Sequence, residues 1–281
     1  MGLLLTDDTS HHKLFMLVGP PRSGKGTIAR VVQRMHGKEN VAGPTLSSLA
    51  MNFGLQELIG KPVAVISDAR LSGRSDAAVI AERLLSISGE DCLTIDRKHR
   101  DPWTGTLPTR FLILTNELPR IADSSGALAS RFVILMLIMS FLGKEDHQLM
   151  TKLTPELSGI FNWALAGRAR LEQRGYFVMP KSSQEAVEEI IALSSPIRAF
   201  IRDCCVIAPA AEVKVSVLYA QWRAWCSIQG SNRPGTVQAF GTALRAAAAH
   251  LKVVQHRDPP EDKLDRYYLG VRLRTEADQC L

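Results

Sequence analysis

The chain has 281 residues, of which 46% are hydrophobic and 22% charged, and its mean hydropathy is zero. These values are typical of a folded globular protein and exclude a disordered or collagen-like chain. The net charge of +6 favours polyanionic partners only weakly, and the length predicts one large domain followed by a smaller one.

Neither a membrane segment nor a disulfide framework is expected. The N-terminal residues include acids where a signal peptide needs positive charge, and the apolar run from Phe132 is about half as long as a membrane-spanning helix. The chain has five cysteines: Cys92, Cys204, Cys205, Cys226 and Cys280. They form no CxxC pair, which argues against a zinc site. We therefore expect reduced thiols in a cytoplasmic protein.

Four short apolar runs predict strands, at 14–18, 63–67, 111–116 and 132–138. They lack the alternation of polar residues that marks a half-exposed strand, so we expect strands buried on both faces. Helical patterns separate them. Residues 1–180 are therefore predicted to form an α/β domain with a central, mostly parallel sheet.

A glycine-rich loop follows the first predicted strand and opens a helix. Its residues are Gly19, Pro20, Pro21, Arg22, Ser23, Gly24, Lys25, Gly26 and Thr27. Gly19, Gly24 and Lys25 fit the pattern G-x-x-x-x-G-K, in which bare backbone N–H groups surround phosphates and the lysine adds a mobile charge. We expect ATP and Mg²⁺ here. Gly26 replaces the usual Ser or Thr, so Thr27 would meet Mg²⁺ directly or through water.

Two polar residues follow predicted strands at the sheet edge where open α/β sheets collect ligands. Asp68 ends the second strand and is our candidate for orienting Mg²⁺ and the attacking water. Asn116 ends the third. Each also fits a simple turn at the end of a strand.

A cluster of basic residues lies between these two strands. It consists of Arg97, Lys98, His99 and Arg100. An alternating run precedes it and the letters DPWTG follow it, which predicts a β-hairpin with a basic tip. Such clusters are usually solvated charge runs, but the position of this one favours a function.

Residues 196–281 predict a second, DNA-binding domain after a linker at 181–195. Helical patterns at 197–207, 215–228 and 236–251 precede two alternating strands. Three helices and a β-hairpin are the order of a winged-helix domain. Its helical aromatic residues, Tyr219, Trp222 and Trp225, are predicted to pack in its core.

The order of these parts resembles the superfamily 3 helicases of the AAA+ class, specifically the phage and poxvirus-like primase-helicase branch. GPPRSGKGT resembles the family's Walker A, VAVISD its Walker B, GEDCLTIDRKHRDPWTG its B-prime element and FLILTNELP its motif C. The resemblance implies a homo-hexamer in which Lys98 and His99 grip DNA phosphates in the central pore. It also implies that Asn116 is sensor 1, holding the lytic water, and that Arg131 is an arginine finger reaching the ATP of a neighbouring subunit.

The resemblance implies an ATP-dependent helicase acting on single-stranded or forked DNA in a phage or mobile-element replication module, in the cytoplasm of a bacterium or an infected host. The family places a helical collar, and often a primase, before the ATPase, whereas about a dozen residues precede the first strand here. We therefore expect either a fragment or a module that uses a collar or primase in trans. Two alternatives stay open: a DNA-binding initiator or regulator with a weak ATPase, and a nucleotide kinase, which the letters GKGT suggest.

Overall fold

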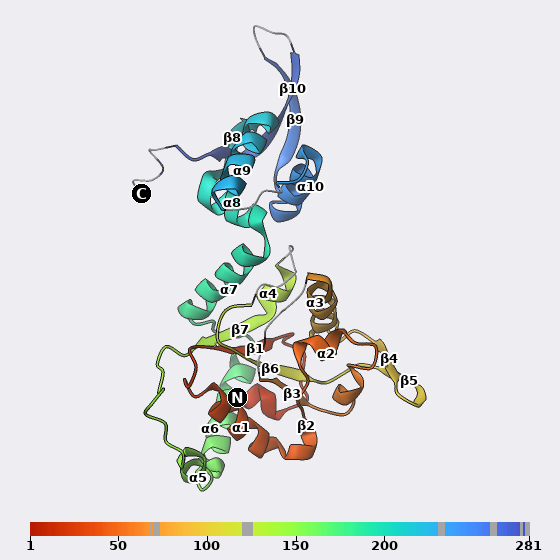
Figure 1. Cartoon of the computed structure of the whole chain (residues 1–281), viewed down its shortest axis with the longest axis vertical. Coiled ribbons are helices and arrows are strands. Elements are labelled where there is room, and N and C mark those ends of the chain that lie inside the picture. Colours follow the sequence, from red (N-terminus) through yellow and green to blue (C-terminus); the bar gives the residue numbers. More distant parts are fainter. Residues whose placement is uncertain are drawn as a thin grey trace. The chain divides into compact units, whose positions relative to one another are not determined.

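The computed structural model describes residues 1–67, 69, 74–119, 126–229, 234–258, 263–275 and 278. The chain divides into two compact units, Met1–Ile190 and Ile191–Leu281. Figure 1 shows both, and each is described by itself. Within the described residues, no helix has the length and apolar character required to cross a bilayer.

A five-stranded parallel sheet forms the centre of the first unit, in the order β2-β3-β6-β1-β7. The strands are β1 (Leu14–Val18), β2 (Val41–Ala42), β3 (Val63–Ile66), β6 (Arg110–Thr115) and β7 (Phe132–Met136). Strands β3 and β6 are buried along their whole length, because central strands of a parallel sheet are covered on both faces. The predicted α/β fold with a central parallel sheet is confirmed.

Helices cover both faces of this sheet. The α-helices of the first unit are α1 (Lys25–His36), α2 (Leu46–Ala50), α3 (Arg74–Ser88), α4 (Ala127–Arg131), α5 (Leu149–Leu153), α6 (Leu157–Arg174) and α7 (Lys181–Ser194), and its 3₁₀ turns are η1 (Gly2–Leu5), η2 (Lys38–Asn40) and η3 (Gln56–Leu58). Side chains alternate between the faces. Leu17 and Leu112 pack with Val32 of α1, whereas Met16 and Ile113 lie beside Ile80 of α3.

A two-stranded antiparallel hairpin extends from the first unit. It is formed by β4 (Leu93–Arg97) and β5 (Arg100–Gly105), which pair only with each other among the described strands. Lys98 and His99 form the turn, and His99 has a φ of 58°. Figure 1 shows the hairpin as a projecting arm. The predicted basic-tipped hairpin is confirmed as a structural element.

In its described residues, the second unit contains helices α8, α9 and α10, which follow the end of α7, and a three-stranded antiparallel sheet in the order β8-β10-β9. Its elements are α8 (Pro196–Cys204), β8 (Cys205–Lys214), α9 (Val215–Ile228), α10 (Val237–Ala247), β9 (Lys252–Asp258) and β10 (Lys263–Leu273). The predicted helix 197–207 is wrong at its end. Cys205 begins a strand because it pairs with Leu273, far away in the sequence.

Aromatic side chains fill the core of the second unit. Phe200, Trp222 and Phe240 are buried, and Tyr219 and Trp225 pack against them. The indole N–H of Trp222 donates a hydrogen bond to the carbonyl oxygen of Pro234 at 2.9 Å, which satisfies the buried polar end of this side chain. The prediction that the helical aromatic residues are core residues is confirmed.

Residues 181–195, expected as a linker, form helix α7 and the residue that precedes α8. Ser183, Ala186 and Ile190 are buried along α7. The division between the units falls inside this helix, between Ile190 and Ile191. The spacing of these buried residues is that of one face of a helix.

Candidate functional site

The loop of residues 19–27 joins the carboxyl end of β1 to the first turn of α1. At two of its positions the local geometry requires glycine. Gly24 has a φ of +92°, a left-handed conformation that glycine adopts without steric cost. A Cβ on Gly19 would lie 2.3 Å from the carbonyl oxygen of Leu137. Only glycine therefore lets the chain that continues from β7 pass so close to the loop.

The ammonium group of Lys25 folds back over its own loop. Its Nζ donates hydrogen bonds to the carbonyl oxygens of Gly19 at 2.6 Å and Pro20 at 2.8 Å, and to Ser23 Oγ at 3.2 Å. Burial lowers the pKa of Lys25, because removing water disfavours the charged form. An anion placed in the loop would compensate that loss.

The loop opens into a cavity of about 790 Å³, a size typical of ligand pockets. The residues lining this loop cavity are Pro21, Arg22, Ser23, Gly24, Lys25, Gly26, Thr27, Arg30, Asn116, Phe141, Lys144, Glu145, Asp146, His147, Leu149 and Met150. The structure therefore brings Lys25, Thr27 and Asn116 together, although Asn116 lies far from the loop in the sequence. A hydrogen bond from Gly19 N to Thr115 O, at 3.3 Å, holds the end of β6 beside the loop.

One wall of the loop cavity comes from residues 137–150, which the sequence analysis did not identify. The backbone N–H of Phe141 donates to Arg22 O at 3.1 Å, and Ser140 Oγ donates to Pro21 O at 2.8 Å. Arg22 Nε also lies 3.4 Å from Glu145 Oε1. This segment carries no recognisable motif. Its only signal was the apolar run from Phe132, which continues beyond the length of β7.

Charged groups of both signs line this wall. Lys144 and His147 are cationic or can become so, whereas Glu145 and Asp146 are acidic. A hydrogen bond from Lys152 Nζ, at 2.6 Å, holds the pKa of Asp146 below its usual range. Asp146 is therefore stabilised in its ionised form, and the ammonium group of Lys152 balances its charge.

The loop cavity offers Thr27 to a Mg²⁺ ion that arrives with a nucleotide. Among the described residues, no group of three His, Cys, Asp or Glu side chains is arranged to hold a metal ion. Mg²⁺ keeps several waters and commonly binds one or two protein oxygens together with phosphates. Thr27 Oγ1 is a suitable oxygen and accepts a hydrogen bond from Arg30 Nη2 at 3.2 Å. Asp68, the other predicted ligand, lies outside the described residues.

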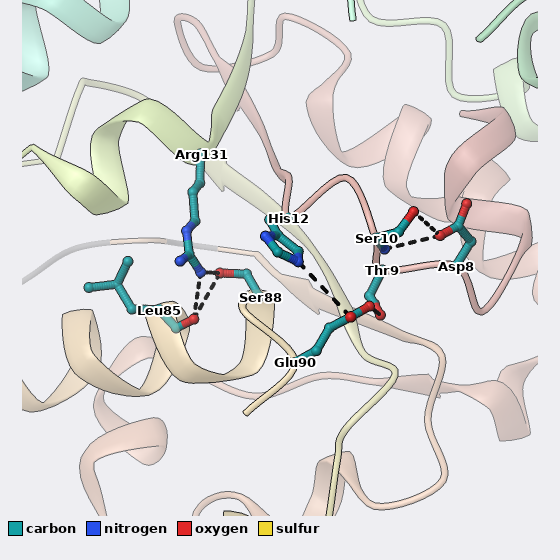
Figure 2. Close-up of polar contacts among 8 residues, drawn as sticks. All are labelled: Asp8, Thr9, Ser10, His12, Leu85, Ser88, Glu90 and Arg131. Carbon is teal, nitrogen blue, oxygen red and sulfur yellow. Dashed lines mark hydrogen bonds and ion pairs between the residues drawn. The ribbon is translucent and has the colours of Figure 1, made fainter. Parts of the chain in front are cut away.

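Arg131 lies at the end of α4 and does not line the loop cavity of its own chain. Its Nη1 donates to the carbonyl oxygen of Leu85 at 2.6 Å and to Ser88 Oγ at 2.8 Å, both in the last turns of α3 (Figure 2). Arg131 is therefore bonded to α3 and is not among the residues that line the loop cavity with Lys25 and Asn116.

The basic residues of the hairpin are presented to solvent. Lys98, His99 and Arg100 are exposed, and Arg97 Nε donates to Asp101 O at 2.8 Å across the turn. The backbone N–H of Lys98 donates to Gln56 Oε1 at 3.1 Å. The backbone of the tip is therefore held while its cationic side chains remain available to an anion.

Comparisons with known proteins agree with this fold. A family model described as a family of unknown function (DUF5906) matches residues 17–131, less than half of the chain. The apo structure of the C-terminal region of NrS-1 has a TM-score of 0.62 at 13% identity, covering 93% of this chain and 67% of that one. The A form apo structure of that region has a TM-score of 0.56 at 15% identity, covering 92% of this chain and 67% of that one.

The chain thus shares its fold with the NrS-1 region and spans about two thirds of that region's length. The X-ray structure of JCV helicase also matches, at 17% identity over 64% of this chain and 50% of that one. Its TM-score of 0.37 is too low to establish a common fold.

Proposed function

We propose that this chain is an ATP-dependent DNA helicase module in which hydrolysis in the loop cavity moves a DNA strand held by the β4–β5 hairpin. The observation that carries the proposal is the convergence of Lys25, Thr27 and Asn116 on one cavity of nucleotide size. The fold shared with the NrS-1 region and the motif order that resembles superfamily 3 helicases support it.

In this proposal the triphosphate lies along the loop of residues 19–27. Backbone N–H groups and the N-terminus of α1 receive its phosphates, and Lys25 exchanges its bonds to Gly19 and Pro20 for bonds to the outer phosphates. Thr27, directly or through water, and Asp68 would hold Mg²⁺, which would offset charge on the phosphates. Asn116 orients the attacking water, and Lys144 and His147 line the remainder of the nucleotide site.

Arg131 completes the site of an adjacent subunit in a homo-hexamer. A guanidinium stabilises the charge that develops on the γ-phosphoryl group, and such an arginine increases kcat by about 10³- to 10⁵-fold. Because Arg131 lies away from the loop cavity of its own chain, hydrolysis in this arrangement needs a neighbour.

The hairpin residues Arg97, Lys98, His99 and Arg100 grip the backbone of single-stranded or forked DNA. Phosphate contacts of this type are independent of sequence and weaken strongly with salt, as movement along a strand requires. Hydrolysis would release the neighbour's contact and shift the hairpin with the strand it holds.

The second unit serves as a winged-helix DNA-binding domain, with α10 as its third helix and β9–β10 as its wing. Gln238 and Arg245 are exposed on α10, and the remaining exposed side chains there are mostly small. We therefore propose contacts to the DNA backbone more than reading of bases. The setting we propose is the replication module of a phage or mobile element, in bacterial or host cytoplasm, working with a primase or collar domain.

ATP turnover measured with and without single-stranded DNA tests the proposal, with unwinding of a forked duplex as the second assay. We expect hydrolysis that DNA stimulates and that Lys25→Ala abolishes. Phosphate transfer to a nucleoside monophosphate without DNA stimulation would instead identify a kinase. DNA binding with negligible turnover would identify an initiator or regulator.

A further inference from the structure

Arg131 is hydrogen-bonded to the end of α3, the helix that precedes the β4–β5 hairpin. Helix α3 ends at Ser88, and Leu85 O in its last turn accepts a hydrogen bond from Gly89 N at 2.8 Å. Arg131 adds a second donor there, since its Nη1 donates to Leu85 O at 2.6 Å and to Ser88 Oγ at 2.8 Å (Figure 2). The guanidinium also lies against Gly89, where a Cβ would be only 3.2 Å from Nη1.

The hydroxyl group of Ser88 donates within its own helix. Ser88 is 5% exposed, and its Oγ lies 2.6 Å from the carbonyl oxygen of Leu84 and 3.3 Å from that of Leu85. A serine hydroxyl has one hydrogen and two lone pairs. Because the hydrogen is donated to a carbonyl oxygen of α3, the hydroxyl oxygen meets Arg131 as an acceptor.

Four residues, 89–92, connect α3 to β4, and they are held on both sides. Asp91 N donates to Ser86 O at 3.0 Å, which folds the connection back onto α3. The carboxylate of Glu90 accepts a hydrogen bond from Thr9 Oγ1 and lies 4.0 Å from His12 Nε2 (Figure 2). A short, bonded connection of this kind passes a displacement of the end of α3 to the base of the hairpin.

Arg131 is able to contact α3 and a phosphate at the same time. A guanidinium has five N–H donors in a planar fork, and both of its bonds to α3 use Nη1. The Nε and Nη2 edge suits two phosphate oxygens. The bonds to α3 therefore set the direction in which this edge points.

We propose that Ser88 is a positioning residue for Arg131, and that the contact between them links a neighbouring subunit's ATP to the hairpin. This inference rests on the proposed function, in which Arg131 meets that ATP. The same pair of hydrogen bonds orients the arginine for the phosphate and ties the phosphate contact to the helix that carries the hairpin.

Ser88→Ala removes the acceptor and tests the inference. We expect kcat for ATP to fall about tenfold, as when one hydrogen bond to a charged group is lost, with KM unchanged. DNA stimulation of turnover should fall with it. The matched control is Ser130→Ala, since Ser130 is adjacent to Arg131 but its Oγ donates to Ala127 O.

Mixing of subunits distinguishes a Ser88 that orients Arg131 from a Ser88 that only stabilises α3. Lys25→Ala subunits cannot hydrolyse ATP but present an intact Arg131 to their neighbours. Mixing them with Ser88→Ala subunits should raise turnover for each Ser88→Ala subunit, because these keep a complete loop cavity. A helix weakened by the substitution would not be repaired by a neighbour. Ser88→Thr keeps the hydroxyl and should retain kcat, whereas the nearly isosteric Ser88→Cys lacks the hydroxyl and should have a lower kcat. This pair compares the presence and absence of the hydroxyl if Ser88→Ala does not fold.

The possible results distinguish failure of the positioning inference from failure of the proposed function. If Arg131→Ala abolishes turnover while Ser88→Ala behaves like Ser130→Ala, the positioning inference is overturned and the helicase proposal stands. If mixing does not raise turnover although Ser88→Ala has lost it, the inference is also overturned. If the unaltered protein shows no DNA-stimulated hydrolysis, the proposed function fails first.

Discussion

Replacing Gly19 by alanine should damage the loop cavity, whereas the same change at Gly26 should not. The new Cβ at position 19 would lie 2.3 Å from Leu137 O and 2.9 Å from Leu137 Cβ, when real Cβ atoms essentially never come within 3.0 Å of another heavy atom. The nearest obstacle is backbone, so the loop or the chain after β7 must move. At position 26 the nearest atom is Arg30 Nη1 at 3.6 Å, an ordinary contact at the end of a flexible side chain.

The magnitude follows from the packing. Forcing extra atoms into a close-packed site costs about 1–3 kcal/mol, which corresponds to roughly a 5- to 150-fold change in a binding constant. ATP binding to Gly19→Ala should weaken by that factor, because the nucleotide must restore the displaced loop. Gly26→Ala should bind ATP normally and be about 0.5–1 kcal/mol more stable, since alanine is favoured over glycine within a helix.

Titration with a fluorescent ATP analogue, together with thermal unfolding of each variant, measures both effects. The pair is matched because each variant adds one methyl group to the same loop. Equal ATP affinity for the two variants would refute the argument that the chain after β7 restricts the loop.

Three further predictions concern the hairpin, the subunit contact and the cavity wall. Lys98→Ala should keep basal ATP turnover but lose its stimulation by single-stranded DNA and the unwinding of forks. Arg131→Ala should abolish turnover while sparing ATP binding, and mixing it with Lys25→Ala should restore part of the activity. Lys152 lowers the pKa of Asp146 below its value in the unfolded chain. The Asp146–Lys152 pair therefore stabilises the fold above pH ~4, and this stabilisation is lost as the pH falls. Lys152→Ala should raise the pKa of Asp146 in an NMR titration.

Each of these predictions has a result that would contradict it. Unwinding retained by Lys98→Ala would contradict the role of the hairpin tip, and Lys38→Ala, an exposed lysine on η2, is the charge-matched control. Failure of the mixing experiment would indicate a site completed within one subunit. An unchanged titration of Asp146 in Lys152→Ala would assign its low pKa to the backbone N–H of Gln148 instead.

The sequence predicts those parts of the fold that depend on local patterns. The strands β1, β3 and β6 are apolar runs and are buried as expected, apart from the half-buried Phe15. The run 132–138 was expected to be buried throughout, but β7 ends at Met136, and Leu135, Met136 and Ile138 are exposed. The glycines of residues 19–27 and the alternation on either side of a short polar turn predict the phosphate loop and the hairpin.

The structural features that the sequence did not predict depend on contacts between residues that are far apart in the sequence. Strand β8 exists because Cys205 and Lys214 pair with residues of β10, and its own letters resemble the tail of a helix. The cavity wall at residues 137–150 is positioned by bonds to Arg22 and Pro21, and no motif marks it. The bonds from Arg131 to α3 connect residues more than forty positions apart.

The bonds that join residues 137–150 to the loop place one wall of the cavity in a stretch that carries no motif. The span matched by the DUF5906 family model ends at residue 131, before this wall begins, although it includes the loop and Asn116. Under the proposed function, substitutions in this wall would reshape the enclosure around a bound nucleotide while residues 19–27 and Asn116 stay unchanged.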